Sequence, residues 1–231
     1  MKVQRLRFRY RVTEQAGSLN NREIATIWAD AITSAGFNVA CSEGRRTTPQ
    51  VSIAAPLPTG VTSECELADV YLSEPADPEA VLAALPAHLP PGVEALAVQE
   101  IGVGAPSLQS QLRWAEYTVT LLPSVDRGNA SRSVERLLAA DSLPSEYQRA
   151  NRVKSYDLRP LIITMDVEER EGGLAVRMRL RAEPERAARA DQVVLALELP
   201  EAERILRTRL ELSEVSEADL AHRRSSFVEG T

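Results

Sequence analysis

The sequence predicts an α+β protein built of two tandem ferredoxin-like units, each with the element order βαββαβ and the second with an extra strand. The chain opens on a run that alternates apolar and charged residues, with the period of two that a strand imposes. Amphipathic helical segments then alternate with strand-like runs, and a similar order restarts after a linker-like segment at 104–111. We therefore expect domains at 1–104 and 112–215, followed by a tail at 216–231 that is a short helix or lacks fixed structure.

The opening strand is predicted over residues 3–12, which read VQRLRFRYRV. Because successive side chains of a strand point to opposite faces, this segment has one apolar row and one row of guanidinium groups. In a ferredoxin-like sheet the first strand is central, and both helices cover one face. We expect the apolar row to pack on the helices and the arginines to lie in the middle of the open face. The two rows are Leu6, Phe8, Tyr10 and Val12, and Arg5, Arg7, Arg9 and Arg11.

The first helix is predicted between Asn20 and Gly36. Asn20 can cap the helix, and Glu23 can reach back to the backbone of the cap as in a capping box. Apolar residues then recur at helical spacing, and Gly36 closes the helix. The other elements predicted for this half are a short run at 51–55, a strand at 64–72, a helix at 78–89 and a strand at 93–101.

The second half repeats this plan as a pattern, without visible sequence identity to the first. A hairpin over 161–182 is predicted to turn at Glu171, Gly172 and Gly173. The other elements expected here are a strand at 113–122, a helix at 130–141, an extended stretch at 145–155, a helix at 190–199 and a strand at 204–212.

The composition is that of an ordinary globular protein. Of 231 residues, 44% are hydrophobic and 26% charged, and the net charge of −6 argues against a general nucleic-acid binder. Positive charge is concentrated near the start, since residues 1–60 hold eight Lys and Arg against four Asp and Glu. No apolar run approaches the ~18 residues that span a membrane, and no signal peptide is apparent. We expect a cytoplasmic protein that does not act at a membrane.

The residues that most often carry catalysis or bind metals are sparse. Cys41 and Cys65 lie far apart, and the histidines are His88 and His222, so no cysteine-built zinc or iron–sulfur site is predicted. No nucleophile–base set and no glycine-rich phosphate loop emerges. We therefore predict no catalytic residue, metal site or cofactor, and favour a binding module over an enzyme.

The arginine row has two interpretations. It is either an anion-binding surface or a face that is solvated or internally paired, in which case Asp69 of the 64–72 strand is the cross-strand partner. The polar loop that follows the first helix adds Arg45 and Arg46, with Ser42 nearby. Arginine together with hydroxyl groups is typical of phosphate contacts, although polar loops often have this composition.

A third polar cluster lies in the second half, in the segment KSYDLRPL. Lys154, Asp157 and Arg159 come close together before a proline. They extend the predicted anion-binding set as the facing wall of a cleft between the halves. The alternative is local scaffolding, because an aspartate at a turn often binds its own backbone.

Several motifs together resemble a known family. The stretch AGFNVACSEGRRTTPQVSIAAPLPTGVTSECELADVYLSEP is similar to the signature of the radical-SAM-associated domains of unknown function, which occur alone or fused behind cobalamin-binding radical SAM domains. The DLRP motif of the second half also fits, so the resemblance covers most of residues 1–212. The matching positions are Ala35-Gly36, Ser42, Gly44, the turn from Pro56 to Gly60, Ser63, Glu66, Lys154 and Asp157 to Pro160.

This sequence also departs from the family pattern. The Ser-His-Leu-Asp that usually begins the first helix is replaced by residues 20–23, which read NNRE and lack the histidine. The loop Phe-Asn-Pro-Arg is replaced by RRTT at 45–48. The basic outer face of the family's first helix is replaced by Thr26, Asp30, Thr33 and Ser34.

The resemblance implies work alongside a radical SAM enzyme, in a family often encoded near ribosome and RNA-processing genes. The chain lacks the three-cysteine motif that begins radical SAM chemistry. We therefore predict a non-catalytic accessory protein that presents an RNA, such as tRNA or ribosomal RNA, to a radical SAM partner.

Two alternatives remain open. Paired ferredoxin-like units also resemble the endonucleases that process CRISPR repeat RNA, although their usual histidine and glycine-rich loop are not evident here. The other alternative is a protein–protein scaffold that binds no RNA, in which the open sheet face is covered by protein.

Overall fold

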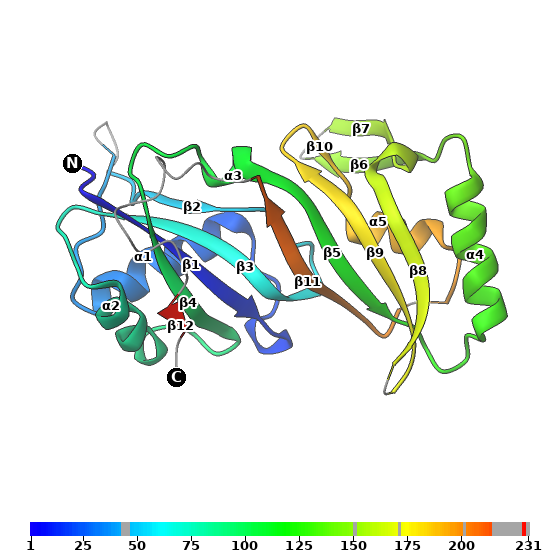
Figure 1. Cartoon of the computed structure of the whole chain (residues 1–231), viewed down its shortest axis with the longest axis horizontal. Coiled ribbons are helices and arrows are strands. Elements are labelled where there is room, and N and C mark those ends of the chain that lie inside the picture. Colours follow the sequence, from blue (N-terminus) through cyan, green and yellow to red (C-terminus); the bar gives the residue numbers. More distant parts are fainter. Residues whose placement is uncertain (43–46, 150–151, 171, 201, 214–227, 230–231) are drawn as a thin grey trace. The chain divides into compact units, whose positions relative to one another are not determined.

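The computed structural model describes residues 1–42, 47–149, 152–170, 172–200, 202–213 and 228–229 (Figure 1). The chain divides into two compact units. The first comprises Met1–Leu112 and Leu212–Thr231, and the second comprises Arg113–Glu211. Both mix helices with mostly antiparallel strands, which confirms the coarser part of the predicted fold class. None of the described helices is both long and apolar enough to cross a membrane.

The first unit is a sheet in which β1 is internal. Strand β1 pairs antiparallel with β3 on one side and with β4 on the other, and β2 extends the sheet beyond β3. The prediction that the first strand is central is thus confirmed for this unit. Its elements are β1 (Gln4–Val12), α1 (Asn21–Ser34), β2 (Val51–Ile53), β3 (Val61–Leu72), α2 (Pro78–Ala84), β4 (Val93–Ile101) and α3 (Leu108–Gln111), with short 3-10 turns at Glu14–Ala16 and Leu85–Ala87.

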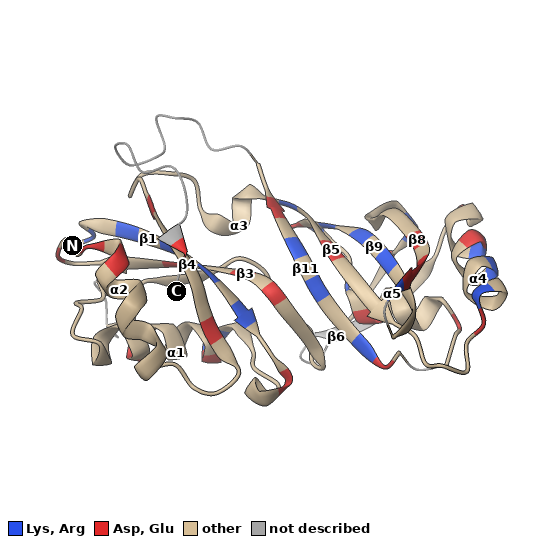
Figure 2. Ribbon diagram, turned by 60° about the horizontal axis from the view of Figure 1, so that its bottom comes forward, with Lys and Arg blue, Asp and Glu red and all other residues tan. Residues whose placement is uncertain are grey.

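Helices α1 and α2 cover one face of this sheet, where they bury the apolar row of β1 (Figures 1 and 2). Trp28 of α1 is fully buried at the centre. Its ring centroid lies 4.8 Å from that of Phe8 and 5.3 Å from that of Tyr10, in tilted and edge-on arrangements that aromatic pairs favour. The predicted packing of the apolar row on the helices is confirmed.

The start of α1 has the predicted capping box. The Asn20 side-chain oxygen accepts hydrogen bonds from the backbone N–H of Arg22 (2.9 Å) and Glu23 (3.1 Å). The Glu23 carboxylate in turn accepts from the Asn20 N–H at 2.8 Å. Gly36, with φ of +91°, follows the last helical residues in the left-handed conformation that ends a helix.

The C-terminal tail contributes a short strand, β12 (Val228–Glu229), antiparallel to β4. We expected a short helix or no fixed structure here. At the edge of a sheet, the outer N–H and C=O groups of a strand have no partner strand. Val228 and Glu229 pair with these groups of β4. Residues 214–227 lie outside the described part of the chain.

The second unit is organised around β9, which pairs antiparallel with β5, β8 and β10, while β11 lies beside β5. Where we expected one extended stretch, β6 and β7 form a separate antiparallel hairpin. The sequence did not predict two strands here, because this polar segment has no alternation that distinguishes one strand from two. The elements are β5 (Leu112–Thr120), α4 (Arg127–Ala139), β6 (Pro144–Arg149), β7 (Arg152–Asp157), a 3-10 turn (Arg159–Leu161), β8 (Ile162–Arg170), β9 (Gly173–Glu183), β10 (Arg186–Ala187), α5 (Ala190–Ala196) and β11 (Arg204–Leu212).

Candidate functional site

The first two arginines of β1 share one buried carboxylate, that of Asp69 on β3. Arg7 lies opposite Asp69 in the strand register. The Arg7 Nε donates to Asp69 Oδ1 at 2.7 Å, and the Arg5 Nε and Nη2 donate to Oδ2 at 3.0 and 2.5 Å. All three residues are at most 2% exposed. Arg5 and Arg7 therefore follow the second interpretation of the arginine row, in which the arginines are paired internally.

The segment 104–111, which we expected to be a linker, lies over these arginines. Arg5 donates to the backbone carbonyls of Ala105 (2.8 Å) and Pro106 (2.9 Å), and Arg7 donates to the side chain of Gln111 (3.2 Å). Carbonyl oxygens of this segment thus accept hydrogen bonds from guanidinium N–H groups that do not bind Asp69. Arg5 and Arg7 are consequently closed to an RNA phosphate, and this half of the predicted anion surface is a structural ion-pair cluster.

The other two arginines of the row are at the surface. The Arg9 side chain is 38% exposed and pairs with Glu229, and that of Arg11 is 45% exposed and pairs with Glu94. The hydrogen bond and the charge of Glu94 raise the pKa of Arg11 above its usual value. Such exposed pairs are screened by water and exchange partners readily, so both guanidiniums are accessible to an anion.

The other predicted anion-binding residues of the first unit lie in the loop after α1. The Ser42 hydroxyl accepts a hydrogen bond from the backbone N–H of Thr48 at 3.3 Å, which closes the ends of this loop. Arg45 and Arg46 lie outside the described residues. Their predicted contact with phosphate stays a prediction.

In the second unit, Asp157 and Arg159 hold the chain together locally. The Asp157 carboxylate accepts from the backbone N–H of Leu143 (2.8 Å) and of Arg159 (3.0 Å), and these bonds, with that of Leu143 the strongest cause, lower its pKa. The Arg159 guanidinium donates to the carbonyl of Leu138 at 2.8 and 3.1 Å. These contacts with the backbone support the interpretation of Asp157 and Arg159 as local scaffolding. Lys154 lies in β7, and its side chain is not among those described.

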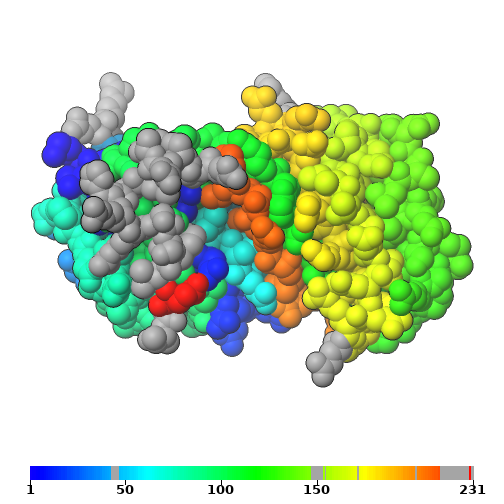
Figure 3. All heavy atoms as spheres, viewed as in Figure 1, coloured from blue at the N-terminus to red at the C-terminus, as the bar shows by residue number. Residues whose placement is uncertain are grey.

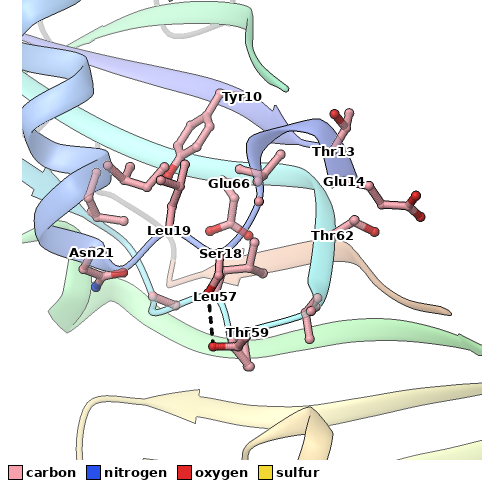
Figure 4. A pocket seen from close by; sticks show the side chains of 18 residues that line it. Tyr10, Thr13, Glu14, Ser18, Leu19, Asn21, Leu57, Thr59, Thr62 and Glu66 are labelled. Carbon is pink, nitrogen blue, oxygen red and sulfur yellow. Dashed lines mark hydrogen bonds between the residues drawn. The ribbon is translucent and has the colours of Figure 1, made fainter. Parts of the chain in front are cut away.

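A cavity of about 300 Å³ lies beside the N-terminal end of α1 (Figure 4). Its walls come from the end of β1, the loop before α1, the turn from Pro56 to Gly60 and the start of β3. Two segments that carry the family resemblance, the proline turn and the acidic strand with Glu66, therefore meet at one place. Sequence reasoning had named them separately and had not predicted a cavity.

Sequence reasoning also missed a surface on the second unit, which we call the Arg–Trp face: Trp114, Glu116, Arg177, Arg179 and Arg209. The guanidinium carbon of Arg179 lies 4.1 Å from the Trp114 ring centroid, and that of Arg209 lies 5.1 Å from it. Since Arg179 is on β9 and Arg209 on β11, with β5 between them, the indole is flanked by two cations. Figures 2 and 3 show these strands side by side at the surface.

Glu116 orders the arginines of this face. It lies between Arg179, which donates at 2.6 and 2.9 Å, and Arg177, which donates at 3.3 and 3.4 Å. Burial by itself raises the pKa of Glu116, but the hydrogen bonds and charges of Arg179 and Arg177 outweigh it and hold the pKa below its usual value. The side chains of Arg177 and Arg209 remain 51% and 58% exposed. The carboxylate is thus ionised, and the arginines are held in place with their outer edges in water.

A sequence signal for this face exists. Residues 176–181 read VRMRLR and alternate like the opening strand, with Val176, Met178 and Leu180 fully buried and the arginines on the other side. The same pattern that drew attention to β1 therefore occurs in β9. In contrast to Arg5 and Arg7 of β1, the arginines of β9 are presented to solvent, and Arg179 lies beside an aromatic ring.

No three His, Cys, Asp or Glu side chains within the described residues come together as metal ligands. A family model described as "Uncharacterized protein conserved in bacteria (DUF2344)" matches residues 5–190. No curated protein matches the chain. Among solved structures, a chain of the "Crystal Structure of a Cbf5-Nop10-Gar1 Complex" is similar with a TM-score of 0.44 and 12% sequence identity, over 88% of this chain and 49% of that chain. The present chain thus spans about half the length of that one.

Proposed function

Because the chain belongs to the DUF2344 family, an uncharacterized family conserved in bacteria, and carries motifs that resemble radical-SAM-associated domains, we propose that it is a non-catalytic accessory protein that presents RNA to a radical SAM enzyme. The RNA is a tRNA or a ribosomal RNA. The chain supplies binding and orientation, and the partner enzyme supplies the chemistry.

The observation that carries the RNA part of this proposal is Trp114 flanked by Arg179 and Arg209. Guanidinium groups bind phosphate in a planar, two-pronged geometry and also stack on bases. Single-stranded RNA is bound by cationic grooves and sheet surfaces that offer aromatic and arginine planes to its bases. Since Arg179 and Arg209 flank the indole, the planes that this face offers to bases are those of its arginines, and the exposed guanidiniums of Arg177 and Arg209 also offer phosphate contacts.

The affinity of this face is expected to be modest. Glu116 and Glu211 neutralise part of its positive charge, since Arg209 donates to Glu211 at 2.9 Å. With about three phosphates contacted, the logarithm of the binding constant should fall with the logarithm of salt concentration with a slope of about −2. Arg9 and Arg11 of the first unit are additional accessible cations.

The proposal is tested by titrating fluorescein-labelled single-stranded RNA of about twelve nucleotides with the full chain, at salt concentrations of about 50 to 200 mM. Trp114 holds the guanidiniums of Arg179 and Arg209 in place, so Trp114→Ala should release the planes on which bases stack, at about 1–3 kcal/mol for each base, and weaken binding at least about fivefold. Arg179→Gln should weaken binding and also reduce the salt slope. Arg132→Gln, on an exposed position of α4, changes the charge equally and should have little effect. Absence of binding, or equal binding by all four proteins, would overturn the RNA proposal.

The partner is tested by co-expression with the radical SAM enzyme encoded in the same organism. We expect the enzyme to co-purify with the chain and to carry RNA with it. If the enzyme co-purifies with wild type but not with Trp114→Ala, and no RNA is present, the Arg–Trp face is a protein interface. That result would replace the RNA proposal with the scaffold alternative.

We also propose that both units are ferredoxin-like. In the first unit the order β1-α1-β2-β3-α2-β4 and the sheet order β2-β3-β1-β4 support this assignment. In the second unit β5-α4-β8-β9-α5-β11 follow one another with the sheet order β8-β9-β5-β11, and β6, β7 and β10 are additions. An experimental structure with a different strand order in either unit would contradict it.

A further inference from the structure

The outer edge of β4 carries a strand that is too short to cover it. Strand β12 pairs with β4 at Ala97 and Val98 only (Figure 1). β4 itself runs over nine residues, and within the described part of the chain no other strand pairs with its outer edge. The N–H and C=O groups along such an edge are a template for a further strand. The backbone hydrogen bonds that β12 can form are largely offset by the entropy lost in ordering it, so the edge is held only weakly by the tail.

The register of β12 shows which side chains this edge accepts. Residues that face each other across antiparallel strands point to the same side of the sheet. Glu229 lies opposite Ala97, which lies opposite Arg9 on the open face, and the Glu229 carboxylate pairs with Arg9. Val228 lies opposite Val98 on the other face, where the helices pack. The strand that occupies the edge therefore turns an acidic residue to the arginine row and an apolar residue to the helix side.

A groove of about 1030 Å³ continues from β12 along the start of β4. It is lined by β4 itself, by α2 with the turn that follows it, and by Arg9, Arg11 and Glu229. Among its apolar lining residues, Leu89, Ala95 and Leu96 are only partly buried. Because β12 is antiparallel to β4, a strand that continued past the position of Glu229 would run along this groove. Its next apolar side chain would contact the apolar wall.

We propose that a partner protein binds here by adding a strand antiparallel to β4 in place of β12, through an extended segment in which apolar and acidic residues alternate. The backbone of the segment pairs with the outer edge of β4. Its apolar side chains enter the groove beside α2, and its carboxylates meet Arg9 and Arg11. In this mode of recognition the main-chain hydrogen bonds give affinity and the alternate side chains give specificity.

The tail is suited to be displaced by such a segment. β12 belongs to the same covalent chain as β4, so its effective concentration is high and a weak contact is enough to close the edge. The Glu229 side chain is 63% exposed, and its pair with Arg9 is screened by water. A longer segment adds backbone pairs along β4 and apolar contacts in the groove. Since the Arg–Trp face is on the second unit, this inference does not rest on the proposed function.

The test is a fluorescence-anisotropy titration of the full chain against a fluorescein-labelled peptide of about eight residues in which valine and glutamate alternate. A peptide of the same composition, with all valines before all glutamates, is the control. We expect it to bind at least about tenfold more weakly, because only alternation places the two residue types on opposite faces of a strand. Bound alternating peptide should also slow amide hydrogen exchange over residues 93–101, measured by mass spectrometry.

Two variants test the role of the tail and of the arginine. Glu229→Lys weakens the hold of the tail on Arg9 and should raise the affinity for the alternating peptide at least about threefold. Glu169→Lys makes the same change of charge in an exposed ion pair of the second unit and should leave the affinity nearly unchanged. Arg9→Glu should reverse the preference, so that a peptide of alternating valine and lysine binds more tightly than the glutamate peptide.

The inference is overturned if the alternating peptide does not bind at about 1 mM, binds no better than the reordered one, or leaves exchange over 93–101 unchanged. Equal effects of Glu229→Lys and Glu169→Lys would overturn it as well. If Glu229→Lys strengthens binding of single-stranded RNA and not of the peptide, the edge serves RNA and the inference is wrong. If Arg9→Glu does not fold, Glu229→Lys and the comparison of the two peptides decide the matter.

Discussion

Arg7 lies directly opposite Asp69 across the pairing of β1 with β3, and its Nε donates to the Asp69 carboxylate over 2.7 Å in a fully buried position. Arg5 binds the same carboxylate from the neighbouring position of its row. Two cations therefore share one anion beneath the segment 104–111, where backbone carbonyls accept further hydrogen bonds from Arg5 and the Gln111 side chain accepts one from Arg7. The open face of the first unit is closed here by its own chain.

Replacing Asp69 by Asn should destabilise the protein strongly. The substitution leaves two buried guanidinium groups without a counter-charge, and breaking a buried ion pair typically costs about 3–5 kcal/mol. Urea unfolding monitored by circular dichroism measures the change. Glu94→Gln, which removes the partner of the exposed Arg11, serves as the control and should leave the free energy of unfolding nearly unchanged. Equal effects of the two substitutions would contradict this account of the cluster.

Replacing Asn20 by Ala should destabilise the start of α1. The change removes the acceptor for the N–H groups of Arg22 and Glu23, and loss of a helix cap costs about 0.5–2 kcal/mol. Asn20→Ser retains an acceptor and should recover most of the loss in the same thermal or urea unfolding experiment. If Ser were no better than Ala at this position, the capping interaction would not be the cause.

The Asp157 carboxylate should make stability depend on pH under acidic conditions. Its pKa in the folded chain is lowered from the ordinary value of 3.8, chiefly by the hydrogen bond from Leu143. The folded state therefore binds the proton less readily than the unfolded state, so the contribution is complete above about pH 5 and is lost as the pH falls through the folded pKa.

The measurement is the free energy of unfolding of wild type and of Asp157→Asn between about pH 3 and pH 6. We expect the difference between the two proteins to be constant above about pH 5 and to shrink below about pH 4, because the variant lacks the titrating group. A difference that is constant over the whole range would show that Asp157 does not stabilise the fold through its charge.

Part of the candidate site could be predicted from sequence, and part could not. The alternation in the opening strand separates Phe8 from Arg7 correctly, because side-chain period is a local property. It does not distinguish the buried Arg7 from the exposed Arg11, since that depends on where 104–111 lies. The sequence likewise marks Glu66 only as part of a motif. Its burial depends on the tertiary structure and was not predicted.

The sequence by itself determined the period of the opening strand, the capped start of α1 and the two faces of β1, because each depends on residues within about one helical turn or strand. Tertiary structure alone decided which charges meet. A shift of two residues between β1 and β3 preserves the faces and would separate Arg7 from Asp69. Likewise, Arg179, Trp114 and Arg209 are neighbours only because β9, β5 and β11 lie side by side, across 95 residues of chain from Trp114 to Arg209.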